Sequence, residues 1–168
     1  MRNDDAEDFA RFVRETGTQL HRAALLLTGE HHRAEDLTQL TYAKVFVAWR
    51  RVQRTDNPLA YARRTLLNAF LSQRRLLREQ ERPVDLTERT DPAAPDPDHA
   101  TRLDLLAALA TLSALDRAVV VLRYFDDRSV ADTAHDLGLT EDVVRTRARR
   151  ALLRLRPQLS PDPLPRSR

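Results

Sequence analysis

The chain has 168 residues, of which 42% are hydrophobic and 32% are charged, a balance that fits a soluble globular protein and excludes a disordered one. The absence of cysteine excludes disulfide bonds and thiolate metal sites. No apolar run approaches the roughly 20 residues of a membrane-spanning helix, and the N-terminus lacks the apolar core of a signal peptide, so we expect a cytoplasmic protein without membrane insertion. Glycine is scarce and runs of alternating polarity are hard to find, which favours an all-α fold.

The net charge of +3 conceals two arginine-rich segments. Arginines outnumber acids strongly between residues 50 and 82, and no acid occurs between residues 143 and 156. The arginines are Arg50, Arg51, Arg54, Arg63, Arg64, Arg74, Arg75, Arg78 and Arg82 in the first segment, and Arg145, Arg147, Arg149, Arg150, Arg154 and Arg156 in the second. Two separate basic segments on a nearly balanced chain indicate two contacts with a polyanion, such as nucleic acid. Solvated helix faces are the alternative interpretation of either segment.

A proline-rich, acidic stretch at residues 83–100 has almost no large apolar side chain. Because such a segment cannot bury enough surface to offset the entropy of ordering it, we expect a flexible linker. It separates two small helical domains, at residues 1–82 and 101–157. Residues 158–168 are expected to form a disordered tail.

The first domain shows three helical patterns. Apolar and small residues recur at three- and four-residue steps from residue 9 to 27, which predicts an amphipathic helix ending near Gly29. A second helix is predicted over residues 32–50. Asn57 followed by Pro58 is typical of a capped helix start, and that helix continues to about residue 80. Short connections between three helices predict a compact bundle.

Four helices are predicted in the second domain, over residues 103–113, 115–125, 130–137 and 141–155. Within the second of these, the apolar residues expected to face inward are Leu115, Val119, Leu122 and Phe125. Ser129 and Thr140 are the expected caps of the last two helices, and Gly138 can adopt the positive φ of the turn between them.

The last two helices form a candidate helix-turn-helix motif. Ala134 would allow the two helices to approach closely, and the predicted buried stripe of the second one is Val144, Ala148, Ala151 and Leu155. The opposite face would enter a DNA major groove and carries Glu141, Asp142, Arg145, Thr146 and Arg149. A plain helical hairpin with solvated arginines is the alternative. The two acids could accept from cytosine amino groups, or they could simply favour the positive end of the helix dipole.

Other chemistry finds little support in the sequence. His31 and His32 are adjacent, so their side chains diverge on a helix, and no further metal ligands can be placed. No glycine-rich phosphate loop and no Ser/His/Asp arrangement is indicated. We therefore expect a protein that is not an enzyme and holds no metal or cofactor.

Both halves of the chain resemble one family. In the second half the matching residues are Leu122-Arg123-Tyr124, Ser129-Val130, Thr133-Ala134, Leu137-Gly138, Val144, Arg150-Ala151 and Leu155-Arg156. In the first half they are Leu26-Leu27-Thr28-Gly29, Ala34-Glu35-Asp36-Leu37-Thr38-Gln39, Trp49-Arg50 and Pro58-Leu59-Ala60-Tyr61-Ala62-Arg63-Arg64 with Asn68. Over residues 6–157 the chain is similar to bacterial RNA polymerase sigma factors of the extracytoplasmic-function (ECF) subgroup, and most to the SigE-like actinobacterial type.

The resemblance implies roles for individual residues. Asp36 and Gln39 match positions that dock on the β′ clamp helices of core RNA polymerase. The loop at residues 51–56, with Arg54, and the helix bearing Arg63, Arg64 and Asn68 match the part that reads the minus-ten element and captures an unstacked base. Arg74, Arg75 and Arg78 would follow the phosphate backbone. The last helix would read the minus-thirty-five element.

The implied function is promoter recognition and strand opening together with core RNA polymerase. The implied partners are that enzyme, through its β′ clamp helices and β flap, and promoter DNA; whether an anti-sigma factor holds the protein inactive is left open. Three departures from the family pattern, at Leu40, at Ser72 and at Glu141-Asp142-Val143, mean that the promoter sequence cannot be copied from relatives. The rival hypotheses are a dimeric helix-turn-helix regulator that acts without polymerase and an interaction module such as an antagonist or adaptor.

Overall fold

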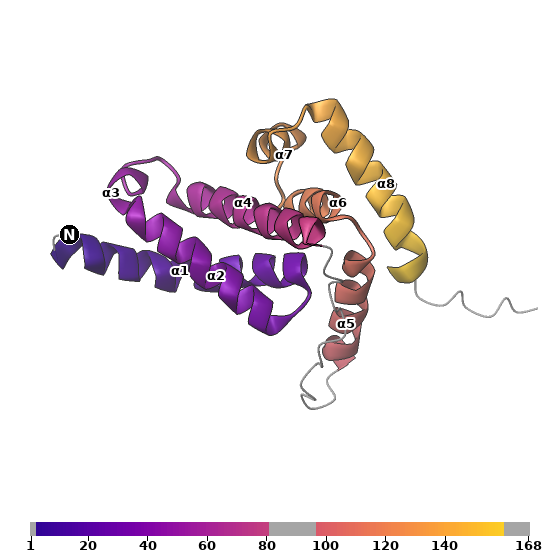
Figure 1. Cartoon of the computed structure of the whole chain (residues 1–168), viewed down its shortest axis with the longest axis horizontal. Helices are drawn as coiled ribbons and strands as arrows, with labels where there is room; N and C mark the ends of the chain where they lie inside the picture. The colour runs from indigo at the N-terminus through magenta and orange to yellow at the C-terminus, as the bar shows by residue number, and fades with distance from the viewer. Residues whose placement is uncertain (1–2, 81–96, 160–168) are drawn as a thin grey trace, which may run out of the picture. The chain divides into compact units, whose positions relative to one another are not determined.

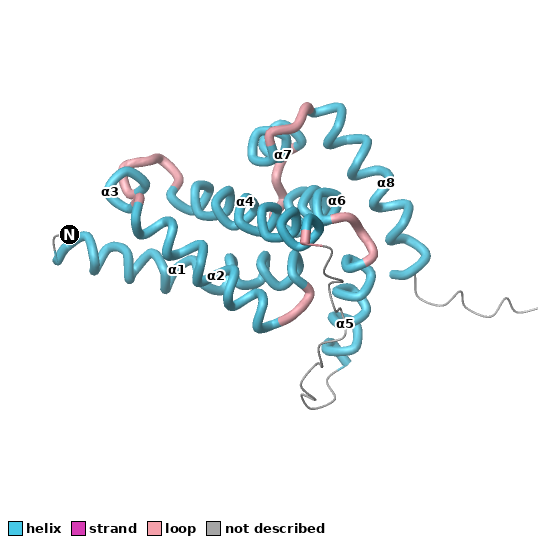
Figure 2. The backbone as a smooth tube through the Cα atoms, viewed as in Figure 1, coloured by secondary structure: helices cyan, strands magenta, loops and turns pink. Residues whose placement is uncertain are grey.

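The computed structural model describes residues 3–80 and 97–159 (Figure 1). The chain divides into two compact units, Met1–Arg89 and Thr90–Arg168. Every regular element in the described ranges is a helix, and no strand occurs there, so the expected all-α fold is confirmed (Figure 2). Among the helices of these ranges, none has both the length and the hydropathy of a membrane span. Residues 81–96, which hold most of the predicted linker, lie outside the described residues.

In the first unit, α1 (Asn3–Thr28) and α2 (His31–Val47) pack against each other. Gly29 ends α1 as predicted, with a φ of 79°. A residue with a Cβ atom would be sterically strained in this conformation. The Glu30 carboxylate then caps α2 by accepting from the His32 backbone N–H at 3.2 Å. The buried face of α1 includes Phe12, Thr16, Leu20, Ala24 and Leu27, as the periodicity predicted.

The second helix is shorter than predicted, because the expected single helix over residues 32–50 breaks at Ala48. A separate turn, α3 (Trp49–Val52), follows the break. The change of direction buries the Trp49 ring, whose centroid lies 5.2 Å from that of Phe9 and 5.0 Å from that of Phe12. The free energy gained by burying these rings offsets the loss of regular helical hydrogen bonds at the break.

The helix α4 (Pro58–Glu79) completes the first unit by packing on α1 and α2. Asn57 caps it as predicted, accepting from the Ala60 N–H at 3.0 Å, with Pro58 at the first helical position. The side chains that α4 buries are Ala62, Arg63, Leu66, Leu67, Ala69 and Phe70. Near the end of α4, Leu76 is exposed, whereas Leu77 is partly buried.

The second unit begins with α5 (Pro97–Ala110), which starts inside the segment predicted as linker and ends before residue 113. The helix α6 (Ala114–Val120) follows, capped by Ser113, whose Oγ accepts from the Asp116 N–H at 3.2 Å. Buried Arg117 joins the two helices by donating to the Ala110 and Leu112 carbonyls at 3.3 and 3.2 Å. A basic side chain thus satisfies carbonyl groups at the end of α5.

The helix predicted over residues 115–125 is present, but only its first half is α-helical. After α6 the chain widens into a π-helical turn, η1 (Val121–Phe125), in which the Asp126 N–H donates to the Val121 carbonyl at 3.0 Å. Val119, Val120, Val121 and Leu122 are buried in succession, so this part of the helix is buried on all sides and not along one face only. Phe125, predicted to face inward, is exposed instead.

The last two helices are α7 (Val130–Leu137) and α8 (Glu141–Leu159). α8 runs four residues beyond the predicted end at residue 155 and passes through Pro157, so it extends into the predicted tail. It packs on α5, α6 and α7. Residues 160–168 lie outside the described part of the chain.

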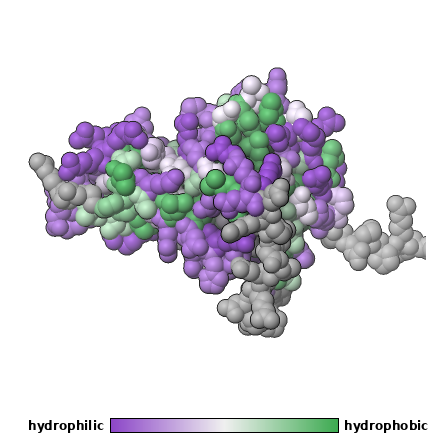
Figure 3. Space-filling model, in the orientation of Figure 1, coloured by the Kyte–Doolittle hydropathy of each residue, from purple (hydrophilic) through white to green (hydrophobic). Residues whose placement is uncertain are grey.

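The face shown in Figure 3 is mostly hydrophilic, with patches of hydrophobic side chains between the polar ones. Large hydrophobic residues that the described surface exposes are Phe46, Val47, Leu76, Tyr124, Phe125, Val143, Leu152, Leu153 and Leu159. Val47 is 88% exposed, directly before the break between α2 and α3.

Candidate nucleic-acid interface

The turn between α7 and α8 has the geometry predicted for a helix-turn-helix motif. Gly138 adopts the left-handed conformation, with a φ of 66°, and the Leu139 N–H donates to the Ala134 carbonyl at 2.9 Å. The caps at Ser129 and Thr140 are both confirmed, since their hydroxyl oxygens accept from the backbone N–H groups of Asp132 (3.0 Å) and Val143 (3.3 Å). The start of α8 is therefore fixed with respect to α7.

The two faces of α8 divide as predicted. The inward stripe, Val144, Ala148, Ala151 and Leu155, is buried. Val144 and Ala148 join Val119 of α6 and Ala134 of α7 in one core cluster. The five residues predicted to enter a major groove are all exposed: Glu141, Asp142, Arg145, Thr146 and Arg149. Because the buried stripe fixes the rotation of α8 about its axis, the exposed face points away from the core of this unit.

The acids at the start of α8 contact a neighbouring arginine. Arg145 lies 3.5 Å from the Glu141 carboxylate and 3.2 Å from that of Asp142. These pairs, together with the favourable position of acids in a first helical turn, explain both acids without a base contact. Arg149 forms no ion pair with any residue in the described ranges, so its guanidinium is available to a ligand.

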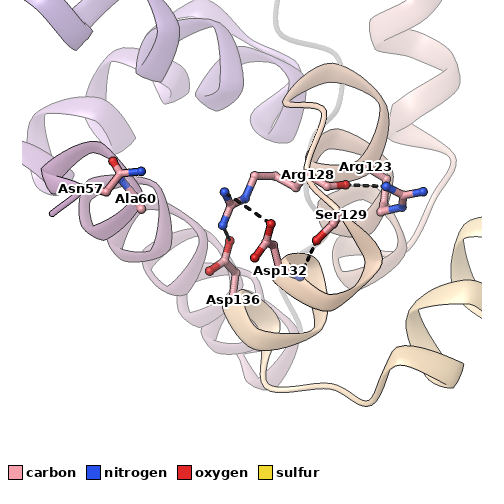
Figure 4. A network of polar contacts seen from close by, with 7 residues as sticks. All are labelled: Asn57, Ala60, Arg123, Arg128, Ser129, Asp132 and Asp136. Carbon is pink, nitrogen blue, oxygen red and sulfur yellow. Dashed lines mark hydrogen bonds and ion pairs between the residues drawn. The ribbon is translucent and has the colours of Figure 1, made fainter.

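A network of hydrogen bonds and ion pairs stabilises the connection between η1 and α7 (Figure 4). Arg128 donates to the Asp136 carboxylate at 3.1 Å and lies 3.9 Å from that of Asp132. Its carbonyl accepts from the Arg123 guanidinium, and its N–H donates to the Leu122 carbonyl at 2.9 Å. Asp136 is only 7% exposed, so this ion pair is largely shielded from water. The network ties α7 to the end of η1.

A shallow groove of about 380 Å³ lies in the second unit, between η1, the start of α7 and α8. Its lining is basic and apolar, without an acid: Arg123, Tyr124, Val130, Arg145, Ala148, Arg149, Leu152, Leu153 and Arg156. Because Arg145 and Arg149 belong both to this groove and to the exposed face of α8, the groove continues the candidate DNA surface.

In the first unit, four predicted DNA contacts lie along one exposed face of α4. Arg64, Asn68, Arg75 and Arg78 are separated by four, seven and three residues, spacings that keep them on one side of a helix. All four side chains are exposed. α4 therefore presents a line of three cations and one amide, which suits a strand with a phosphate backbone.

Two other arginines of α4 are less exposed than these four residues. Arg63 is only 8% exposed, because it lies on the side of α4 that packs into the bundle, so the expectation that it meets DNA does not fit its position. Arg74 is half-buried, with its guanidinium 5.6 Å from the centre of the Phe70 ring. Burial, and next the nearby charge of Arg33, lower the pKa of Arg74 from its ordinary value. We leave Arg63 out of the candidate surface.

The predicted loop at residues 51–56 is partly helical, because α3 extends to Val52 and the connection to α4 covers only residues 53–57. Arg54 is exposed in this connection. Beside it, Arg51 donates to the Tyr61 hydroxyl at 3.1 Å, and its guanidinium lies 5.8 Å from the centre of the Tyr61 ring. The connection is thus flanked by a guanidinium held against an aromatic ring.

The two predicted polymerase contacts, Asp36 and Gln39, lie one turn apart and are exposed on α2. The opposite side of α2 buries Ala34, Leu37, Thr41 and Val45. Both side chains are accessible to a partner protein, and their role stays a prediction.

The residues that position these surfaces carry no local signal in the sequence. The Arg128–Asp136 pair spans eight residues, and Asp5 of α1 contacts Arg50 and Gln53 across more than forty. The periodic pattern of apolar residues in the sequence does not predict such contacts. The run of consecutive apolar residues at 118–122 indicates a helix that is buried on more than one side.

The two units match two parts of one protein family. Residues 12–80 match the family described as sigma-70 region 2, and residues 102–155 match sigma-70, region 4. These matches cover the bundle of the first unit and the helix-turn-helix unit, in that order along the chain.

Individual relatives agree with the family matches. The RNA polymerase sigma-E factor of Streptomyces coelicolor is 30% identical over 152 residues, which are 90% of this chain and 86% of that protein. The ECF RNA polymerase sigma factor SigL of Mycobacterium tuberculosis is 33% identical over 82% of this chain and 80% of its own length. The solved structure of the sigma factor RpoE from Bartonella quintana, in complex with the anti-sigma factor NepR, has a TM-score of 0.73 and 27% identity, covering 91% of this chain and 97% of that one. The chain therefore belongs to the ECF group of sigma-70 RNA polymerase sigma factors, and it is SigE-like.

Proposed function

We propose that the second unit of this sigma factor reads the minus-thirty-five element as intact duplex through α8. The observation that carries the proposal is the division of α8 into a buried stripe and an exposed face with Arg145 and Arg149. A helix fixed in this way fits the major groove with its first turns directed at base edges. Arg149 is the better candidate for a base or phosphate contact, because Arg145 is already paired with two acids.

The first unit binds the minus-ten element as a separated strand. The exposed line of Arg64, Asn68, Arg75 and Arg78 on α4 supports this role, and the connection with Arg54 lies at the start of the same helix. Guanidinium groups offer planes on which an unstacked base can stack, and they also contact phosphates. Strand opening follows because bases captured outside the duplex no longer pair.

The protein acts by binding, not by catalysis, together with core RNA polymerase in the cytoplasm. Asp36 and Gln39 contact the β′ clamp helices, and the second unit contacts the β flap. The hypothesis of a dimeric regulator that acts without polymerase finds no support among the related proteins, which are named sigma factors.

An anti-sigma factor is proposed as a further partner. The structural relative RpoE was solved in complex with the anti-sigma factor NepR, and its likeness to this chain covers both units.

The polymerase contact is tested by a binding titration of labelled core RNA polymerase. The double variant D36A/Q39A should bind core enzyme about tenfold more weakly than the wild type, because an exposed contact site loses a carboxylate and an amide. The matched control is D4A/Q19A, which removes the same two side-chain types from exposed positions of α1. Equal affinity of both variants would contradict the assignment of Asp36 and Gln39.

A further inference from the structure

The connection between α3 and α4 is held by hydrogen bonds within it and at its ends. The Thr55 N–H donates to the Val52 carbonyl at 3.0 Å, and the Thr55 hydroxyl donates to the same carbonyl at 2.7 Å. At its far end, Asn57 caps α4. The side chains of Arg54 and Asp56 are left exposed between these two anchors.

A carboxylate from the distant start of the chain also reaches this region. Asp5, in the first turns of α1, accepts from Arg50 Nε at 3.3 Å through one oxygen and from Gln53 Nε2 at 3.2 Å through the other. Its side chain is 17% exposed, whereas that of Arg50 is 67% exposed. Asp5 is therefore shielded beneath groups that lie at the surface.

The backbone around Asp5 is firmly placed. Four residues further along α1, the Phe9 ring contacts the rings of Trp49 and Phe46, with centroids 5.2 and 4.9 Å apart. Asp5 thus extends from a helix that is packed against α3, and it holds Gln53, the first residue after α3. On the other flank, Arg51 is held by Tyr61.

We propose that Asp5 is a positioning residue for strand capture: by holding Arg50 and Gln53, it fixes the connection between α3 and α4 in the shape that accepts an unpaired base. The inference rests on the proposed function of the first unit. Asp5 itself touches no DNA. Its effect is to order the binding surface before the strand arrives, so that less conformational freedom is lost on capture.

The contact with Arg50 and Gln53 must be distinguished from a simple helix-dipole effect, because acids near the start of any helix are stabilising. Asp4 provides the matched control. It lies in the same turn of α1 and is exposed, and it forms no hydrogen bond or ion pair with the described residues. D4A and D5A change the helix dipole interaction similarly, but only D5A releases the connection.

The experiment uses holoenzyme assembled from core RNA polymerase and the full chain, with permanganate reactivity of unpaired thymines as the measure of opening. D5A should lower opening on a duplex promoter by about three- to tenfold, which corresponds to the net contribution of one typical hydrogen bond. D5N, which keeps an acceptor oxygen for Gln53, should fall between D5A and the wild type. D4A should stay within about twofold of the wild type.

Two further readouts separate positioning from a loss of stability. The first readout is the amount of open complex on a set of promoters in which each base of the minus-ten element is substituted in turn. D5A should reduce the ratio between the amount on the preferred base and the amounts on the other bases. A lower melting temperature of the protein alone would not change this ratio. Adding Q53A to D5A should cause no further loss, because both changes remove the same contact. If D5A and D4A open promoters equally well and with equal base preference, the inference is wrong while the proposed function stands. If the wild-type holoenzyme opens no promoter, the proposed function itself fails, and this inference fails with it.

Discussion

Arg128 and Asp136 form an ion pair at 3.1 Å that ties the connection after η1 to the last turn of α7. Asp136 is almost fully buried and Arg128 is largely so. A carboxylate in such a place is tolerated because the guanidinium compensates its charge and satisfies an oxygen that water does not reach. The pair therefore positions α7, and through the turn at Gly138 it positions α8.

Removing one partner of this ion pair should lower the stability of the second unit. R128M should lower the free energy of unfolding of the second unit by about 2–4 kcal/mol, because it leaves a buried carboxylate without its cation. The measurement is urea denaturation of the full chain followed by circular dichroism. The control is D132N: Asp132 is exposed and 3.9 Å from the same guanidinium, so its loss should cost less than about 0.5 kcal/mol. Equal effects of the two changes would show that the buried pair does not stabilise the unit.

The same substitution should have opposite effects at two glycines. G138A should destabilise the protein by about 1 kcal/mol, because φ is positive there and an L-residue is strained even though nothing lies within 4 Å of the added Cβ atom. G17A should stabilise it by about 0.5–1 kcal/mol, because Gly17 lies inside α1 and the new Cβ atom would meet only the Tyr42 hydroxyl at 3.9 Å. Thermal denaturation of both variants checks the signs. A stabilising G138A would contradict the turn geometry on which the helix-turn-helix assignment depends.

On the exposed face of α8, Arg149 should contribute more to DNA binding than its neighbours. R149A should weaken binding of the holoenzyme to the minus-thirty-five element by about 1–3 kcal/mol, and it should reduce the slope of log affinity against log salt by about 0.9 if the contact is with a phosphate. R145A should have a smaller effect, since Arg145 is already paired with Glu141 and Asp142.

R154A is the control for these two variants, because Arg154 is exposed on the opposite side of α8 from Arg145. Fluorescence anisotropy over a salt series provides the affinities. A loss of affinity in R154A as large as that in R149A would mean that overall charge, not one face of α8, attracts the DNA.

Asn68 should act in strand opening more than in binding of the duplex. N68A should lower the amount of open complex by about three- to tenfold, which corresponds to the loss of one hydrogen bond to an unpaired base. Initial binding to the closed promoter, measured at low temperature, should change little. Q73A removes a similar amide from the opposite exposed side of α4 and should leave opening unchanged. If N68A and Q73A lower the amount of open complex equally, the assignment of Asn68 to strand capture is contradicted.

The helical order of both units could be predicted because it depends on local signals. The caps at Asn57, Ser129 and Thr140 and the turn at Gly138 are encoded within four residues of each helix start, and the buried stripe of α8 follows directly from a period of 3.6 residues.

The features that could not be predicted depend on distant packing. Directly after the break at Ala48, Trp49 packs against the rings of α1, and η1 continues a stretch of consecutive buried residues that begins in α6. The burial of Arg63 next to exposed Arg64 depends on the rotation of α4 against α1 and α2, which a count of arginines does not report.

The central claim is that this chain directs core RNA polymerase to promoters. Run-off transcription with purified core enzyme, across genomic fragments that include the region upstream of this gene, tests it most directly. The account predicts transcripts with defined start sites that appear only when the chain is added and that are reduced by both R149A and N68A. If the chain does not associate with core enzyme, or if it directs initiation at no start site, the account is contradicted.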